Sequence, residues 1–80
     1  MPYGEFPQFA EYGTKEMIRI IGEARLSKTD QEIARGRLVE HRAYADIAAA
    51  LSRDRSGVSR RLRQVIVPHL VEFLRRSGRG

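Results

Sequence analysis

Apolar residues recur along the chain at intervals of three and four, the spacing that places side chains on one face of an α-helix. This spacing predicts helices over about 15–24, 28–39, 44–51, 55–67 and 69–76. The residues expected to point inward are Met17, Ile20, Ile21, Ala24, Leu26, Ile33, Ala34, Leu38, Ile47, Ala48, Leu51, Val58, Leu62, Val65, Leu70, Phe73 and Leu74. No stretch alternates as a strand would. The predicted fold class is therefore all-α, a small domain of four to five helices.

Capping and breaking residues set the predicted ends of these helices. Thr14 is the expected N-cap of the first helix, Ser27 of the second and Asp54 of the fourth. Gly36 weakens the second helix and is expected to let another helix approach closely. Pro68 is expected to break or kink the fourth helix, because proline has no amide proton and disfavours helical geometry in the residue before it.

The two ends of the chain differ from its helical middle. Residues 1–13 contain two of the three prolines and four aromatic residues, Tyr3, Phe6, Phe9 and Tyr12, and predict an irregular N-terminal arm. Either one or two of these aromatics pack on the domain or the arm is disordered. Residues 14–76 are expected to form a single domain, followed by a flexible tail over 77–80.

The amino-acid composition argues against several classes of function. The 80 residues include no cysteine, so disulfides and thiolate metal sites are excluded. No apolar run approaches the roughly 20 residues of a membrane span, and there is no signal-peptide pattern, so we expect a cytoplasmic bacterial protein without a membrane partner. His41 and His69 stand apart from any nucleophile, and no carboxylate pair or glycine-rich phosphate loop is present. We therefore expect no enzymatic activity, small-molecule substrate, metal or cofactor.

Positive charge is concentrated in the last third of the chain. The net charge is +5 overall, but residues 1–51 carry seven Lys or Arg against eight Asp or Glu, and residues 52–80 carry eight Arg against two acidic residues. Thirteen of the fifteen basic residues are Arg, whose planar fork suits phosphates and guanine edges. This asymmetry is typical of a protein that binds a polyanion. The alternative is a solvated charged surface without a partner.

Helices 44–51 and 55–67, with the short turn between them, form the pattern of a helix-turn-helix. On the second of these helices, the apolar residues share one face and Ser56, Arg60 and Arg63 share the opposite face. Short hydroxyls at the start of such a helix, followed by longer guanidinium groups, suit the major groove of double-stranded DNA. The candidate base contacts are Arg55, Ser56, Ser59, Arg60 and Arg63, and the candidate phosphate contacts are Arg42, Tyr44, Arg53 and Arg61. The alternative for Tyr44 is an aromatic at the edge of the core.

Two segments resemble known DNA-binding families. Residues 32–39, EIARGRLV, resemble the EIARGxLV segment of TrfB/KorA-like plasmid transcriptional repressors, and residues 55–59, RSGVS, are similar to the RGAVS that opens their recognition helix. Residues 44–48 with the following turn look like region 4 of bacterial sigma factors, although Ser52 and Arg53 stand where that turn usually has Gly and an apolar residue. The resemblance to the repressors implies operator binding as a dimer.

These observations predict a sequence-specific DNA-binding transcriptional regulator, a repressor from a plasmid or other mobile element that is associated with the nucleoid. A homodimer is expected, either through Leu70, Phe73 and Leu74 or through the N-terminal arm. The alternatives are an adaptor that binds protein partners as sigma region 4 does, and a non-specific architectural DNA binder.

Overall fold

The computed structural model of the chain describes residues 6–78. Its α-helices are α1 (Thr14–Glu23), α2 (Lys28–Ala34), α3 (Tyr44–Ala50), α4 (Arg55–Arg61) and α5 (Val67–Arg76), and a 3₁₀ turn covers Pro7–Phe9. Two π-helical segments, Arg35–Val39 and Leu62–Ile66, extend α2 and join α4 to α5. Residues 6–78 contain no strand, so the predicted all-α class is confirmed.

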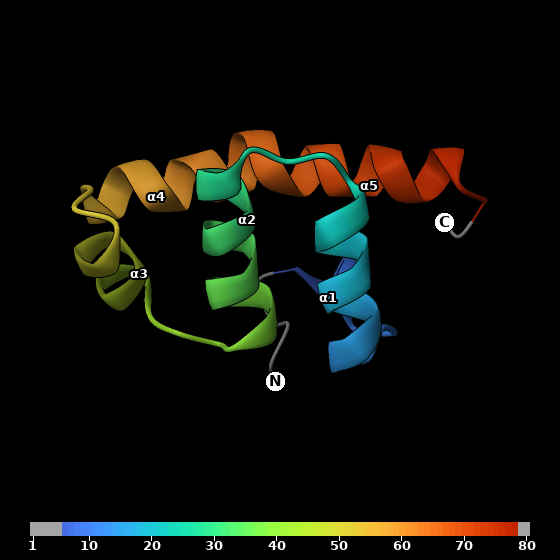
Figure 1. The fold of residues 1–80 in the computed structure, drawn as a ribbon, viewed down its shortest axis with the longest axis horizontal. Coiled ribbons are helices and arrows are strands. Elements are labelled where there is room, and N and C mark those ends of the chain that lie inside the picture. Colours follow the sequence, from blue (N-terminus) through green and yellow to red (C-terminus); the bar gives the residue numbers. More distant parts are fainter. Residues whose placement is uncertain (1–5, 79–80) are drawn as a thin grey trace.

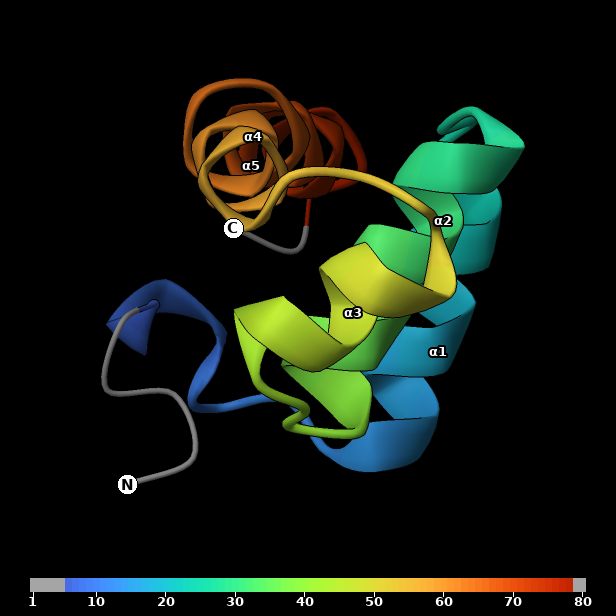
Figure 2. The same cartoon turned by 90° about the vertical axis from the view of Figure 1, so that its left-hand side faces the viewer.

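One long helix supports the rest of the molecule. In Figure 1, α4 and α5 form a continuous helix across the top, while α1 and α2 lie side by side beneath it and cross its axis steeply. The end-on view of Figure 2 places α4 and α5 one behind the other, which shows that they are coaxial. These 22 residues span about 33 Å at 1.5 Å per residue, close to the 35 Å length of the molecule. The remaining helix, α3, packs against α4 near its start.

The core lies between the long helix and the pair α1–α2. Most of the residues expected to point inward are buried there, while Leu51 and Phe73 are half-buried at its edge. The buried side chains are those of Phe6, Phe9, Met17, Ile20, Ile21, Ala24, Leu26, Ile33, Ala34, Leu38, Ile47, Ala48, Val58, Leu62, Ile66, Val67, Leu70 and Leu74. Leu70 and Leu74 are buried within the single chain, and of the three α5 residues named for a dimer only Phe73 is partly exposed.

The predicted helix starts are correct for α2 and α4 and wrong for α1. Ser27 caps α2, since its Oγ accepts a hydrogen bond from the Asp30 amide at 3.2 Å. Asp54 caps α4 in the same way, with Oδ2 3.4 Å from the Gly57 amide. Thr14 is instead the first residue of α1, and the N-cap is Gly13, which has no side chain to accept a bond.

The close approach expected at Gly36 is present. A Cβ atom at this position would lie 3.1 Å from Cγ1 of Ile47. That distance is shorter than ordinary van der Waals contact, so the absence of a side chain at Gly36 lets α3 pack directly on the π-helical end of α2.

Of the break or kink expected at Pro68, the break does not occur, and the helix is instead distorted in the turn before the proline. The chain remains helical from Arg55 to Arg76, and Pro68 is the second residue of α5. The turn before it is widened, with the Val67 amide bonding the carbonyl of Leu62, five residues earlier. A proline in a regular α-helix clashes with the carbonyl four residues before it, here that of Gln64, and a π turn relieves such a clash by moving that carbonyl away.

Val65 was expected to point inward, and the same widened turn explains why it does not. Val65 is 42% exposed, whereas its neighbour Ile66 is fully buried. A regular helix advances about 400° in four residues, so a stripe with a spacing of four drifts about 40° at each step. The π segment is underwound and cancels part of this drift. Val58, Leu62, Ile66, Leu70 and Leu74 therefore all face the core at four-residue intervals.

The described part of the predicted N-terminal arm is packed on the domain. Phe9 is fully buried and Phe6 nearly so, and the 3₁₀ turn is held by hydrogen bonds such as that from the Phe9 amide to the Phe6 carbonyl at 3.1 Å. Phe9 and Tyr12 share a shallow depression with Val71 and Leu74 of α5. Tyr3 of the arm and residues 79–80 of the predicted tail lie outside the described residues.

Candidate nucleic-acid interface

The connection between α3 and α4 is a short turn that ends α3 sharply. Ser52 adopts the left-handed region with φ of 54°, and the Ser52 and Arg53 amides bond back to the carbonyls of Ala49 and Ala48 at 3.3 and 2.8 Å. This pair of bonds is the Schellman motif, which usually places Gly at the left-handed position. Ser52 thus takes the conformation of that Gly at a cost in backbone strain. The turn directs α4 away from α3 and leaves the outer face of its first turns exposed.

A shallow depression of about 460 Å³ lies where the start of α3 meets the first turns of α4. Its walls come from the π-helical end of α2, from the start of α3 with its N-cap, from α4 and from the π-helical segment after α4. They are formed by Arg37, Ala43, Tyr44, Ala45, Arg55, Ser56, Ser59 and Arg63. We call this surface the arginine depression. Three of its residues are arginines and the others named carry no charge at neutral pH, so its lining carries a net positive charge. It combines guanidinium groups with the hydroxyl groups of two serines, which suits an anionic partner that also offers hydrogen-bonding groups.

Tyr44 is central to the arginine depression. The Arg37 guanidinium carbon, Cζ, lies 4.3 Å from the centroid of the Tyr44 ring, within the range of a cation–π contact. The Cζ atom of Arg63 lies 6.0 Å from the same centroid, at the limit of that range. One half-buried ring therefore contacts arginines from two different elements.

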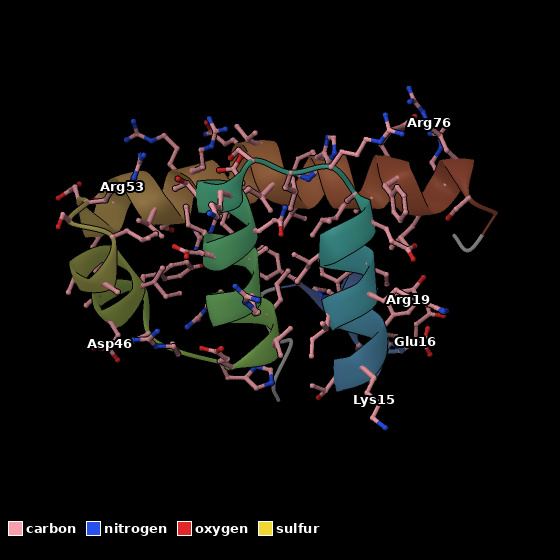
Figure 3. All side chains as sticks on the ribbon, in the orientation of Figure 1. Lys15, Glu16, Arg19, Asp46, Arg53 and Arg76 are labelled. Carbon is pink, nitrogen blue, oxygen red and sulfur yellow. The ribbon has the colours of Figure 1, made fainter. Side chains whose placement is uncertain are left out.

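The arginine depression contains five of the nine residues predicted to contact DNA: Tyr44, Arg55, Ser56, Ser59 and Arg63. Arg60 and Arg53 do not line it, but both are exposed on the same part of the molecule, on α4 and on the turn before it. Figure 3 shows Arg53 at the end of the molecule formed by the α3–α4 turn. These positions are compatible with the predicted roles, which stay predictions.

The other two predicted phosphate contacts lie elsewhere. Arg42 lines a separate depression between α2 and α3, where its Nη1 is 3.9 Å from Oε1 of Glu40. Arg61 holds an internal ion pair, in which its Nε and Nη2 donate to the two carboxylate oxygens of Asp30 at 2.9 and 2.7 Å. The Arg61 side chain is 48% exposed and already engaged in this ion pair, and its predicted contact with a phosphate stays a prediction.

The Asp30–Arg61 pair connects α2 to α4. Asp30 is 5% exposed, and the bidentate hydrogen bonds from Arg61 lower the pKa of its carboxyl, with the charge of Arg61 adding to the effect against the opposing effect of burial. The same bonds raise the pKa of Arg61. Arg61 is the last residue of α4. Its pairing with Asp30 therefore fixes the rotation of α4 about its own axis relative to α2.

Sequence reasoning missed Arg37 and the role of Asp30. The sequence predicts no partner for the Asp30 carboxylate, since nothing local pairs it with a residue 31 positions away. Arg37 precedes α3 by seven residues and reaches Tyr44 only because the chain reverses between them. That reversal uses His41 in the left-handed region, with φ of 56°, and a bond from the Arg42 amide to the Gly36 carbonyl at 2.9 Å. A non-glycine residue in this conformation leaves no clear sequence signal.

Neither His41 nor His69 belongs to a group of metal-binding side chains among the residues that the structure describes. His69 donates from Nε2 to the carbonyl of Ala24 at 2.5 Å, which ties α5 to the end of α1. Among residues 6–78, no group of three or more His, Cys, Asp or Glu side chains is placed to hold a metal ion. None of the helices in this described range is both long enough and apolar enough to cross a membrane.

Comparison with known proteins finds no family model, no curated protein and no solved structure that matches the chain. The likeness to plasmid repressors and to sigma region 4 therefore stays a prediction from the sequence.

Proposed function

We propose that this chain is a sequence-specific regulator of transcription that binds double-stranded DNA, a repressor from a plasmid or other mobile element acting in the bacterial cytoplasm. The observation that carries the proposal is the arginine depression. It brings four candidate base contacts, residues 55, 56 and 59 on α4 and residue 63 on the π-helical segment that follows it, together with Tyr44 at the start of α3. A partner that offers both phosphates and base edges matches this combination of groups.

In the proposed complex, the first turns of α4 enter the major groove. Ser56 and Ser59 are short enough to let the backbone approach base edges, and the Arg55, Arg60 and Arg63 side chains are long enough to reach guanine O6 and N7. Arg53, on the turn before α4, lies where a phosphate contact would fix the register of the helix. Occupation of a promoter by the bound protein would repress transcription.

A second copy of the chain is part of the proposal, since a dimer doubles the contact with DNA and gives a two-fold operator. Leu70 and Leu74 are buried within the single chain, so the proposed interface uses the partly exposed residues around them. The half-buried apolar side chains beside them, Tyr12, Val71 and Phe73, are the remaining candidates.

Selection of bound sequences from a random pool of DNA duplexes tests the proposal. We expect an enriched consensus, with two inverted half-sites if the protein binds as a dimer. Replacing Arg60 by Ala should cost about 1–3 kcal/mol at one base position and relax specificity there. Arg19→Ala removes the same charge from α1, at the other end of the molecule, and is the control (Figure 3).

Two results would overturn parts of this proposal. Equal affinity for selected and random duplexes would indicate an architectural DNA binder without sequence specificity. Absence of binding to any duplex at low salt would contradict DNA binding and favour a protein-interaction adaptor.

A further inference from the structure

We propose that Arg37, held against the ring of Tyr44, binds a phosphodiester of the DNA backbone and so extends the contact with DNA from α4 to the end of α2. The inference rests on the proposed function and adds to it a residue outside the two helices of the predicted motif. Arg37 belongs to the π-helical segment Arg35–Val39.

The Arg37 side chain is fixed in place before any ligand binds. Its guanidinium lies 4.3 Å from the centroid of the Tyr44 ring, and its Nη1 donates a hydrogen bond of 2.8 Å to the carbonyl of Arg42. A mobile arginine side chain on a protein surface loses conformational entropy when it binds an anion. Arg37 has already lost part of that freedom on folding, so more of its interaction with an anion appears as affinity.

Like charges gather around Tyr44. Arg37 and Arg63 both contact its ring, and Arg55 lines the same depression. The ring offsets part of their mutual repulsion through its negative face. A bound phosphodiester would remove more of it, because a single anion attracts all three guanidinium groups.

The position of Arg37 favours a phosphate over a base. Base edges are read by side chains of the helix that enters the groove, whereas flanking elements contact the backbone on either side. Arg37 is such a flanking residue, since α3 separates it in sequence from α4, and it reaches the edge of the depression beside the α4 residues. Its contribution should therefore be independent of sequence and sensitive to salt.

The role of Tyr44 follows from the same geometry. Tyr44 was predicted to contact a phosphate itself, but in the structure its ring packs against the guanidinium group of Arg37. In this arrangement Tyr44 is a positioning residue, whose aromatic face matters more for binding than its hydroxyl.

Binding of the full chain to a random-sequence duplex, measured over a range of salt concentrations, tests the inference. Arg37→Ala should weaken binding roughly tenfold. It should also make the negative slope of log K against log salt concentration shallower by about 0.9, the value for one phosphate contact. The matched control is Arg35→Ala, which removes an exposed arginine two residues away that lines the separate depression with Glu32 and Glu40. This control should retain both the affinity and the slope of the unmodified protein.

Two further variants test the positioning role. Tyr44→Leu should weaken binding at least as much as Arg37→Ala, because the ring also contacts Arg63. The double variant should bind no worse than Tyr44→Leu, because the loss of the ring already removes the contact that holds Arg37. Tyr44→Phe keeps the ring and should bind within about twofold of the unmodified protein. Thermal unfolding of each variant checks that it is folded; if Tyr44→Leu is not, Arg37→Ala and Tyr44→Phe decide.

The outcomes separate this inference from the proposed function. If the unmodified protein binds DNA but Arg37→Ala keeps its affinity and salt slope, the inference is wrong and the proposed function stands. A change in preference at one base position in Arg37→Ala would also overturn it, since a backbone contact carries no base preference. If the unmodified protein binds no duplex at low salt, both fail together.

Discussion

Asp30 is a carboxylate placed in the interior and neutralised by an arginine from a distant part of the chain. Its carboxylate oxygens accept two hydrogen bonds from Arg61, and its backbone amide donates to Ser27 at the start of α2. A buried carboxylate without such a partner would be costly, because desolvation penalises the charged form. The pair therefore makes the position of α4 dependent on an ion pair with α2.

This ion pair predicts a dependence of stability on pH. Arg61 lowers the pKa of Asp30 in the folded protein, so the unfolded chain binds a proton at Asp30 more readily than the folded one. The stabilisation is fully present above the pKa of the unfolded chain and is lost as the pH falls through the lower pKa of the folded protein. Asp30→Asn should therefore lower the free energy of unfolding by about 1–3 kcal/mol at neutral pH, with a difference that shrinks in acid. Urea unfolding at several pH values measures this.

Glu32→Gln is the matched control for this experiment. Glu32 lies on the same helix two residues away and is exposed. Its replacement should change stability by less than about 0.5 kcal/mol. A constant difference between Asp30→Asn and the unmodified protein at all pH values would contradict the assigned role of the ion pair.

At the scale of elements, the long helix combines a regular start, an underwound middle and a regular end. Its buried stripe has a spacing of four residues, longer than the 3.6-residue turn of an α-helix, and the π segment Leu62–Ile66 accommodates the difference. Pro68 follows this segment and is tolerated there. The chain can therefore use one helix both to expose Arg55, Arg60 and Arg63 and to cover α1 and α2 with its other half.

Two neighbouring residues test which side of this helix faces the core. Ile66→Ala should lower the free energy of unfolding by about 2–5 kcal/mol, because it leaves a cavity in the core. Val65→Ala removes a side chain that is 42% exposed and should cost less than about 1 kcal/mol. Chemical denaturation of both variants gives the comparison. Equal costs would indicate a regularly wound helix in which both residues share the boundary of the core.

At the scale of the whole molecule, the N-terminal segment completes the core. A domain of this size buries a smaller fraction of its surface than a larger one, so its free energy of unfolding is small. Phe9 is fully buried, and the depression that it lines is shared with Leu74 of α5, so residues near the two ends of the described chain pack together.

Phe9→Ala should therefore destabilise the entire domain. The expected loss is about 3–5 kcal/mol, which is comparable to the total stability of a small domain, so circular dichroism at 25 °C should show substantial unfolding. Phe9→Leu keeps most of the apolar volume and should cost less than about 1.5 kcal/mol. Replacing the exposed neighbour Gln8 by Ala is the control. A fully folded Phe9→Ala variant would mean that the segment is dispensable for the fold.

The candidate site was predictable where its geometry is local. Arg55, Ser56, Ser59 and Arg63 lie within one run of helix, and a helical period alone places them on one side. Tyr44 belongs to the adjacent helix of the same short unit, so its proximity followed from the turn between them. The caps at Ser27 and Asp54 are local in the same sense, and both are confirmed.

The tertiary structure alone decided the contacts of Arg37 and Arg61 and the burial of Ile66 in place of Val65. Arg61 is one of several arginines along α4 until α2 places Asp30 beside it, and Arg37 is a residue at the end of a helix until the chain reversal at His41 brings it to Tyr44. The physical reason is the range of the interactions. Helix periodicity and capping depend on neighbours within about four residues, which the sequence displays directly. Ion pairs, ring contacts and the winding of a helix against a core depend on residues that only folding brings together.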